Sequence, residues 1–184
     1  MKRKDFTKRL TGHSKLPALK ILFMEVKKTL DVGDEVPNFC LKGIDPEGKE
    51  GEFCFDLFRD RKVILYFYPK DNTPGCTTEA CDFRDNLNVL KSLGITVIGI
   101  SPDSVESHKR FRQKHNLNFY LLSDPHKEVA QIFGAYGEKK SYGKTTKGII
   151  RSTFYIERGK IVKAWRNVRA KGHVERILKE LGLK

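Results

Sequence analysis

Apolar runs and amphipathic segments alternate along most of the chain. Residues 63–68 (VILYFY) and 95–101 (ITVIGIS) are short and almost continuously apolar. Runs of this length and composition are typical of strands that are covered on both faces of a sheet. The pattern therefore predicts two buried strands in the centre of the fold.

Each of these runs precedes a segment with helical periodicity. Residues 73–93 carry apolar side chains three or four positions apart, which predicts an amphipathic helix that ends at Gly94. Residues 104–116 predict a second helix, for which Ser104 is a favoured N-cap. The order strand, helix, strand, helix favours an α/β fold.

Shorter patterns predict the remaining elements of one domain over residues 29–184. They are two strands within 32–58 joined by a turn at 45–51, a strand-like link at 118–124, a short helix at 126–134, a hairpin turning at Arg158-Gly159 within 152–165, and a last helix at 173–182. The Gly-rich residues 134–148 predict a long exposed loop without a nucleotide-binding glycine motif. We expect a mixed central sheet with helices on both faces and an N-terminal hairpin.

The net charge of +13 is concentrated in the first part of the 184-residue chain. Residues 1–28 contain nine basic and two acidic residues, and so carry +7 of it. We expect a flexible basic extension; a signal or transit peptide, or translation starting at Met24, is the alternative. Clustered cations also suit a nucleic-acid-binding tail, although no base-reading module follows. No apolar run reaches the roughly 20 residues of a membrane helix, and we expect a cytoplasmic protein.

The four cysteines do not suggest a disulfide framework in a chain of this size. Cys40 and Cys54 lie in short apolar segments that predict strands, where cysteine usually acts as a small apolar side chain. No CxxC motif or zinc-type spacing occurs, and the five histidines are scattered. We therefore expect structural thiols at these two positions and no metal site.

Cys76 lies at the junction between the first apolar run and the helix that follows it. Thr73 is a favoured N-cap and Pro74 a favoured first helical residue, so Cys76 falls in the first turn. It also belongs to the apolar stripe that continues at Ala80 and Phe83. Unpaired N–H groups and the helix dipole favour a thiolate at such a position. These residues alone leave two interpretations open, a packed core side chain or an activated nucleophile.

Cys81 follows five positions later on the same predicted helix. On an ideal helix the Cα atoms of residues five apart are about 8.7 Å from each other. A disulfide rarely spans more than about 7 Å between Cα atoms. A bond between Cys76 and Cys81 therefore requires the first turn, which starts at Pro74-Gly75, to unwind.

These residues resemble the active site of the peroxiredoxin family, specifically its Q-type or bacterioferritin-comigratory branch. The family signature of Pro, three residues, Thr or Ser, two residues and Cys is matched by Pro69, Thr73 and Cys76 in YPKDNTPGCTTEACDFRD. Cys81 matches the resolving cysteine that much of this branch carries five positions further on. The resemblance extends over roughly residues 30–183 and includes the segment GIIRSTFYIERGKIVKAW.

The resemblance implies a thioredoxin-like fold and a thioredoxin-dependent peroxidase that reduces hydrogen peroxide and organic hydroperoxides without a cofactor. It implies that Cys76 attacks the peroxide and becomes a sulfenic acid, and that Cys81 resolves this acid to an intrachain disulfide. It assigns Arg151 to stabilise the thiolate, Thr73 to orient the peroxide and Pro69 to shield the sulfur. Members of this branch are often monomers, and a dimer is also compatible with the sequence.

Each of these residues has a structural alternative. Thr73 caps a helix and Pro69 ends a strand whatever the chemistry, and Arg151 by itself is an ordinary surface cation. Glu79 either interacts with the helix dipole, pairs with a cation or holds the folded turn around Cys76, and the sequence leaves these roles open. The alternative functions are a protein thiol–disulfide oxidoreductase and a nucleic-acid-binding protein.

Overall fold

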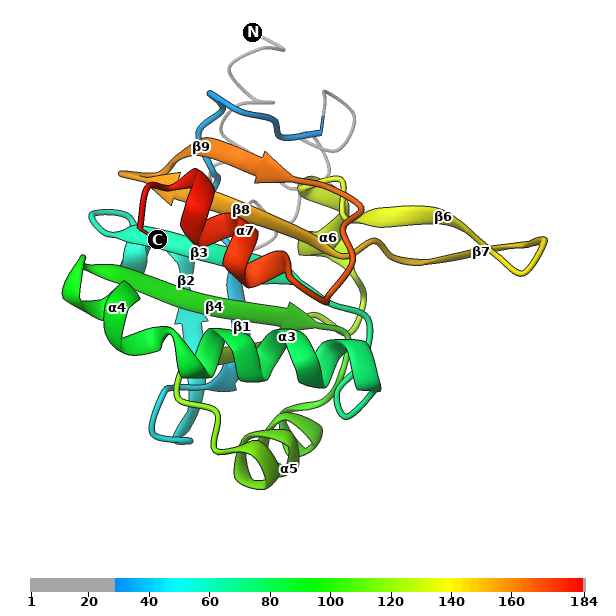
Figure 1. Cartoon of the computed structure of the whole chain (residues 1–184), viewed down its shortest axis with the longest axis horizontal. Helices are drawn as coiled ribbons and strands as arrows, with labels where there is room; N and C mark the ends of the chain where they lie inside the picture. The colour runs from blue at the N-terminus through cyan, green and yellow to red at the C-terminus, as the bar shows by residue number, and fades with distance from the viewer. Residues whose placement is uncertain (1–28, 184) are drawn as a thin grey trace, which may run out of the picture.

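A computed structural model describes residues 29–183; the tail of residues 1–28, with the expectations that concern it, lies outside this range. A seven-stranded sheet forms the centre of the fold (Figure 1). Its strands, in spatial order, are β2 (Glu50–Cys54), β1 (Cys40–Ile44), β5 (Tyr120–Ser123), β4 (Ile95–Ser101), β3 (Lys62–Phe67), β8 (Ser152–Glu157) and β9 (Lys160–Trp165). The predicted N-terminal hairpin is confirmed as β1 and β2.

The sheet is mixed, as the sequence predicted. The central strands β3, β4 and β5 run parallel to one another, and the two apolar runs at 63–68 and 95–101 pair along the whole length of β3. On either side the sheet continues with antiparallel partners, β1 beside β5 and β8 beside β3. Parallel neighbours in the middle explain why these strands are apolar on both faces.

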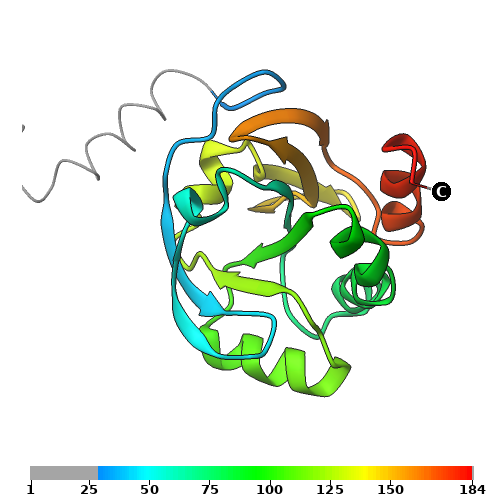
Figure 2. The same cartoon turned by 90° about the vertical axis from the view of Figure 1, so that its left-hand side faces the viewer.

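Helices cover both faces of the sheet, as predicted (Figures 1 and 2). Buried side chains of α3 (Pro74–Asp85), α4 (Leu87–Ser92), α5 (Val105–His115) and α7 (His173–Glu180) belong to one core cluster. Those of α6 (Glu128–Ile132) and the 3-10 helix η1 (Phe55–Phe58) belong to a second cluster. None of the helices described is long and apolar enough to cross a membrane.

The single helix predicted over residues 73–93 is wrong, because two helices, α3 and α4, occupy this segment. Asn86 separates them, with φ −104° and ψ 6°. Its side-chain Nδ2 donates a hydrogen bond to the carbonyl oxygen of Asp82 at 2.8 Å, which competes with the regular helix ladder. Gly94 follows α4 with φ 75°, as expected for a helix end.

The loop predicted at residues 134–148 is also wrong. An antiparallel hairpin of β6 (Tyr136–Ser141) and β7 (Lys144–Ile149) projects from the domain (Figure 1). Tyr142 and Gly143 form its two-residue turn with φ 52° and 77°, the positive values that a type I′ turn requires. Most of the hairpin is exposed, so neither strand has the alternation of apolar and polar residues that predicts a half-buried strand.

The expectation for Cys40 and Cys54 is partly corrected. Both lie in strands, but they face each other in register across β1 and β2 and form a disulfide. Cys40 is exposed and Cys54 half-buried, so neither is a small apolar core residue. The hairpin brings together two cysteines that are 14 positions apart, and Cys76 and Cys81 are the free thiols.

Candidate active site

The junction of β3 and α3 positions Cys76. A loop of residues 68–72 leaves the end of β3, and Thr73 then takes the extended N-cap conformation, with φ −82° and ψ 154°. The side chain of Cys76 is 1% exposed and belongs to the same core cluster as Ala80 and Phe83. The predicted apolar stripe of this helix is therefore confirmed, with the thiol in its first turn.

The guanidinium of Arg151 contacts the sulfur of Cys76. Arg151 lies between β7 and β8, where its carbonyl oxygen accepts a hydrogen bond from the N–H of Val168 at 3.0 Å. Its Nη2 donates to Cys76 Sγ at 3.3 Å. A Cβ at Gly75 would stand 3.2 Å from the same Nη2, so the absent side chain lets the guanidinium approach the helix closely. A cationic donor at this distance stabilises negative charge on sulfur.

Glu79 binds the other side of the same guanidinium. Arg151 Nη1 donates to Glu79 Oε1 at 2.6 Å, and the carboxyl group is completely buried. Burial raises the pKa of Glu79 to about 7, although Arg151 acts to lower it. The second oxygen, Oε2, is buried without a hydrogen-bond partner among the described residues. Of the roles that the sequence left open for Glu79, pairing with a cation is the one observed.

The raised pKa of Glu79 predicts a pH-dependent contribution to stability. The reference pKa is 4.5 and the folded value about 7, so between these values the folded protein binds a proton that the unfolded chain has released. The free energy of unfolding therefore contains a term that decreases as the pH rises through this window. We therefore compare the free energies of unfolding of the wild-type protein and Glu79→Gln. The difference, wild type minus variant, should fall by about 3 kcal/mol between pH 4.5 and 7. Urea unfolding of both proteins at several pH values measures this difference, and a constant difference contradicts the assignment.

A buried carboxylate that sequence reasoning missed anchors the loop before Cys76. Asp71 Oδ1 accepts a hydrogen bond from the Tyr68 hydroxyl at 2.7 Å, and Oδ2 lies 2.7 Å from Nδ1 of the buried His108 on α5. The N–H of Asp71 donates to Asp103 Oδ2 at 2.8 Å. These bonds close the loop on itself and tie it to α5 and to the segment before α5, so the first turn of α3 starts from a fixed position. A histidine on the inner face of the predicted helix over 104–116 was a sequence signal for this network.

A lysine of the projecting hairpin also faces the site. Lys139 on β6 interacts electrostatically with Arg151 and Cys76, and burial, followed by Arg151, lowers its pKa. Sequence reasoning missed Lys139 because it treated the hairpin as a loop. A second cation near the sulfur adds to the positive potential that favours an anion there.

Thr73 and Pro69 lie close to Cys76 along the chain. Among the described residues, neither of them forms a hydrogen bond with the Cys76 sulfur. The Thr73 hydroxyl donates to the carbonyl oxygen of Lys70 at 2.8 Å instead of accepting from a helix N–H. Pro69 is half-buried at the start of the loop. The N-cap position of Thr73 is confirmed, whereas the catalytic roles of both residues stay predictions.

Cys81 is half-buried and free, and it belongs to the same continuous helix as Cys76. The structure therefore brings Cys76 and Arg151 together and leaves Cys81 more than one helical turn away. Its role as the resolving thiol stays a prediction. An intact α3 is the arrangement expected before any reaction between the two cysteines.

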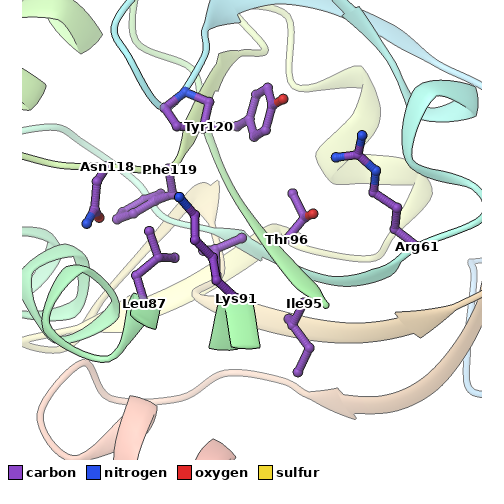
Figure 3. A pocket seen from close by; sticks show the side chains of 10 residues that line it. Arg61, Leu87, Lys91, Ile95, Thr96, Asn118, Phe119 and Tyr120 are labelled. Atoms are coloured by element: carbon purple, nitrogen blue, oxygen red, sulfur yellow. The ribbon is translucent and has the colours of Figure 1, made fainter. Parts of the chain in front are cut away.

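A separate cavity of about 140 Å³ lies beside the start of the central strand β4 (Figure 3). Its wall includes Ile95, at the start of β4, whereas Cys76 follows the end of the parallel strand β3. Polar side chains, among them Arg61, Lys91 and Asn118, line it together with apolar ones. The cavity is therefore not the space in which a substrate of Cys76 could react.

Comparison with known proteins identifies the family of this chain. Residues 32–165 match the AhpC/TSA family. A protein of Mycobacterium tuberculosis that is named as a peroxiredoxin is 49% identical over 155 residues, which cover 84% of this chain and 96% of the relative. Peroxiredoxin Bcp of Bacillus subtilis is 44% identical over 154 residues, which cover 83% of this chain and 96% of the relative.

Solved structures with the same fold are also peroxiredoxins. A cysteine-to-serine mutant of PrxQ from Xylella fastidiosa superposes with a TM-score of 0.76 at 35% identity, over 84% of this chain and 97% of that one. Peroxiredoxin Q of Xanthomonas campestris gives a TM-score of 0.70 at 36% identity, over 77% and 89% of the two chains. These neighbours confirm the thioredoxin-like fold that the sequence resemblance implied. The chain therefore belongs to the AhpC/TSA family, within the Bcp and peroxiredoxin Q group, and is a thiol peroxidase.

Proposed function

We propose that Cys76 is the nucleophile that reduces the peroxide. The observation that carries this proposal is the 3.3 Å hydrogen bond from Arg151 Nη2 to the Cys76 sulfur in the first turn of α3. The guanidinium and the unpaired N–H groups of that turn both favour a thiolate. The thiolate attacks one peroxide oxygen and the O–O bond breaks. The sulfur becomes a sulfenic acid, and the other oxygen takes up a proton and leaves as water or an alcohol.

Arg151 stabilises the charge as it moves during this step. Negative charge passes from sulfur to the leaving oxygen, and a guanidinium held on its far side by Glu79 remains beside both atoms. Thr73, at the N-cap, is placed to orient the peroxide through its hydroxyl. Pro69, at the start of the same loop, shields the sulfur from bulk water. These two assignments rest on the family signature together with the positions of the residues around the first turn.

Cys81 then resolves the sulfenic acid. Its thiolate attacks the oxidised sulfur of Cys76, an S–S bond forms, and the hydroxyl group leaves as water after protonation. In an intact helix the two Cα atoms are about 8.7 Å apart, beyond the reach of a disulfide. The first turn of α3 must therefore open locally, which requires much less free energy than unfolding of the domain.

Hydrogen peroxide and organic hydroperoxides are the proposed substrates, and thioredoxin is the proposed dithiol that reduces the Cys76–Cys81 disulfide. The bacterioferritin comigratory protein of Xanthomonas campestris, 36% identical to this chain, has alkyl peroxide reduction activity, which supports the organic substrates. Both electrons come from thiols, so the reaction needs no cofactor. The proposed enzyme is a cytoplasmic monomer whose domain spans residues 29–184 and follows the basic residues 1–28.

Peptide mapping after one equivalent of hydrogen peroxide tests this mechanism. The full chain is used with the Cys40–Cys54 disulfide intact, so that only Cys76 and Cys81 carry free thiols. We expect both thiols to disappear together, and the two fragments that cleavage after Glu79 produces to stay linked. A link from Cys76 to Cys40 or Cys54, or a thiol at Cys76 that survives, contradicts the proposal.

Replacing Cys81 by serine should separate the first turnover from recycling. The first reduction of peroxide is expected to keep its rate within about twofold, because Cys76 and Arg151 are untouched. Steady-state turnover with thioredoxin should fall at least about tenfold, because no intrachain disulfide forms for exchange. The double variant Cys40→Ser/Cys54→Ser is the matched control, since it removes two distant sulfurs and should keep full turnover. Unchanged steady-state turnover in the Cys81→Ser variant would exclude Cys81 from the mechanism.

A further inference from the structure

Cys40, Glu52 and Cys54 form a cluster on one face of the edge hairpin β1–β2. Cys40 faces Cys54 in the strand register and Lys42 faces Glu52, and residues two apart on a strand lie on the same side. The two sulfurs and a carboxylate oxygen of Glu52 all lie within 4.8 Å of one another. Cys40 and Glu52 are exposed and Cys54 is half-buried, so the cluster opens to solvent. None of these groups takes part in the site around Cys76.

The hairpin backbone holds the two cysteines together independently of their disulfide. β1 and β2 pair over five residues, from Cys40↔Cys54 to Ile44↔Glu50. Just beyond the cysteines, the N–H of Phe55 donates to the carbonyl oxygen of Phe39 at 2.8 Å, and the two rings stack with centroids 5.6 Å apart. Bonds on both sides of the cysteine pair therefore keep the sulfurs adjacent after reduction.

The exposed position of Cys40 gives the cluster two accessible redox states. A thiolate can reach an exposed disulfide, attack one sulfur and displace the other. With a dithiol, the class of reductant that a thiol peroxidase uses, the second thiol completes the exchange. The hairpin then carries two thiols, at Cys40 and Cys54. The reductant has supplied the two electrons and leaves as a disulfide.

We propose that the reduced Cys40–Glu52–Cys54 cluster is a binding site for a thiophilic divalent cation of the Zn²⁺ class, and that the disulfide closes this site. Cysteine sulfur and carboxylate oxygen bind Zn²⁺ at about 2.3 Å and 2.0–2.2 Å. Ligand atoms around a tetrahedral ion are then about 3.5–3.8 Å apart. The two sulfurs, which the disulfide now joins, therefore move apart after reduction, whereas the Glu52 oxygen already lies within 4.8 Å of both. Three protein ligands leave the fourth position for water. Binding displaces the two thiol protons, and the disulfide removes both sulfur ligands.

The charges around the cluster suit a divalent cation. Two thiolates and one carboxylate carry three negative charges, a divalent ion offsets two of them, and Lys42 lies opposite Glu52 to offset the third. Glu52 makes no ion pair within the described residues, so its carboxylate is available as a ligand. Glu50, the next residue on the same face, instead lies 2.9 Å from Lys109 Nζ. Glu50 therefore provides a matched carboxylate that is already engaged elsewhere.

Titration with Zn²⁺ or Cd²⁺ tests the proposal. The protein is the full chain with the substitutions Cys76→Ser and Cys81→Ser, which remove the other two thiols. The protein is reduced with dithiothreitol, freed of reductant without oxygen, and titrated with either ion. We expect one equivalent to bind with release of two protons, and Cd²⁺ to give an ultraviolet thiolate charge-transfer band. The same protein with the Cys40–Cys54 disulfide intact should bind no equivalent.

Three further variants in this background identify the ligands. Cys40→Ser should abolish the charge-transfer band of the two-sulfur site, and circular dichroism checks that the domain is folded. Glu52→Gln should weaken binding at least about tenfold, while Glu50→Gln leaves it within about twofold. The proposal is overturned if the reduced protein binds no equivalent, if the oxidised form binds equally well, or if Glu52→Gln and Glu50→Gln behave alike.

Discussion

Replacing Cys76 by serine should lower the second-order rate constant for peroxide reduction at least about 10³-fold. The substitution nearly preserves the size of a side chain that is 1% exposed, and Arg151 Nη2 can still donate to the new oxygen. A serine hydroxyl stays protonated at neutral pH, whereas a helix N-terminus and a cation can hold a thiol as its anion. The measurement is stopped-flow reaction of the reduced protein with one equivalent of hydrogen peroxide.

Two controls distinguish loss of the nucleophile from loss of the fold. Cys81→Ser removes the neighbouring thiol of the same helix and should keep the rate of the first turnover. Urea unfolding of Cys76→Ser should give a transition like that of the wild-type protein. If Cys76→Ser keeps more than about a tenth of the wild-type rate, another group is the nucleophile.

Replacing Arg151 by methionine should lower the same rate constant about 10²- to 10³-fold. Methionine has a comparable length but provides neither the charge nor the N–H groups that reach Cys76 Sγ at 3.3 Å and Glu79 Oε1 at 2.6 Å. Without the guanidinium, burial raises the pKa of Glu79 further, so this carboxyl group becomes protonated and neutral. The variant therefore does not bury an unpaired charge. The loss should therefore appear in the reaction with peroxide more than in the stability of the domain.

A conservative variant and a matched surface variant test this explanation. Arg151→Lys keeps the charge, but one ammonium group cannot reproduce the fork that binds sulfur and carboxylate together, so we expect an intermediate loss. Arg158→Met removes the same charge from the exposed turn between β8 and β9, which lies beside the start of β3, whereas Cys76 follows its end. This variant should change the rate less than about twofold, because a distant exposed charge is screened. Equal rates for Arg151→Met and Arg158→Met would show that the contact with Cys76 has no catalytic effect.

The buried Arg151–Glu79 pair also suggests how the helix can open without disrupting the core. Cys76 lies in the first turn of α3 and Glu79 one turn later, and both contact the same guanidinium. Unwinding the first turn separates the sulfur from Arg151 while the 2.6 Å ion pair can remain in place. We therefore expect the disulfide-forming state to keep the second half of α3 folded.

Sequence patterns predicted those parts of the fold whose side chains are sorted by burial. The apolar runs at 63–68 and 95–101 became the paired central strands, and Thr73 and Ser104 begin the helices that they were expected to cap. The hairpin of β6 and β7 escaped prediction because exposed strands need no apolar alternation. The break at Asn86 escaped because a local side-chain bond to Asp82 interrupts a helix whose apolar periodicity continues through it.

The sequence by itself determined the strand-to-helix junction of Cys76, since the N-cap, the proline and the apolar stripe are local features read along one segment. Arg151 was expected at the site only through family resemblance, because a residue 75 positions from Cys76 leaves no local signal of contact. Tertiary structure alone decided that Glu79 pairs with this arginine and that Cys40, Glu52 and Cys54 meet on one hairpin face. The physical reason is that periodicity and capping act between near neighbours in the chain, whereas charge pairing and ligand clusters depend on which distant segments the sheet brings together.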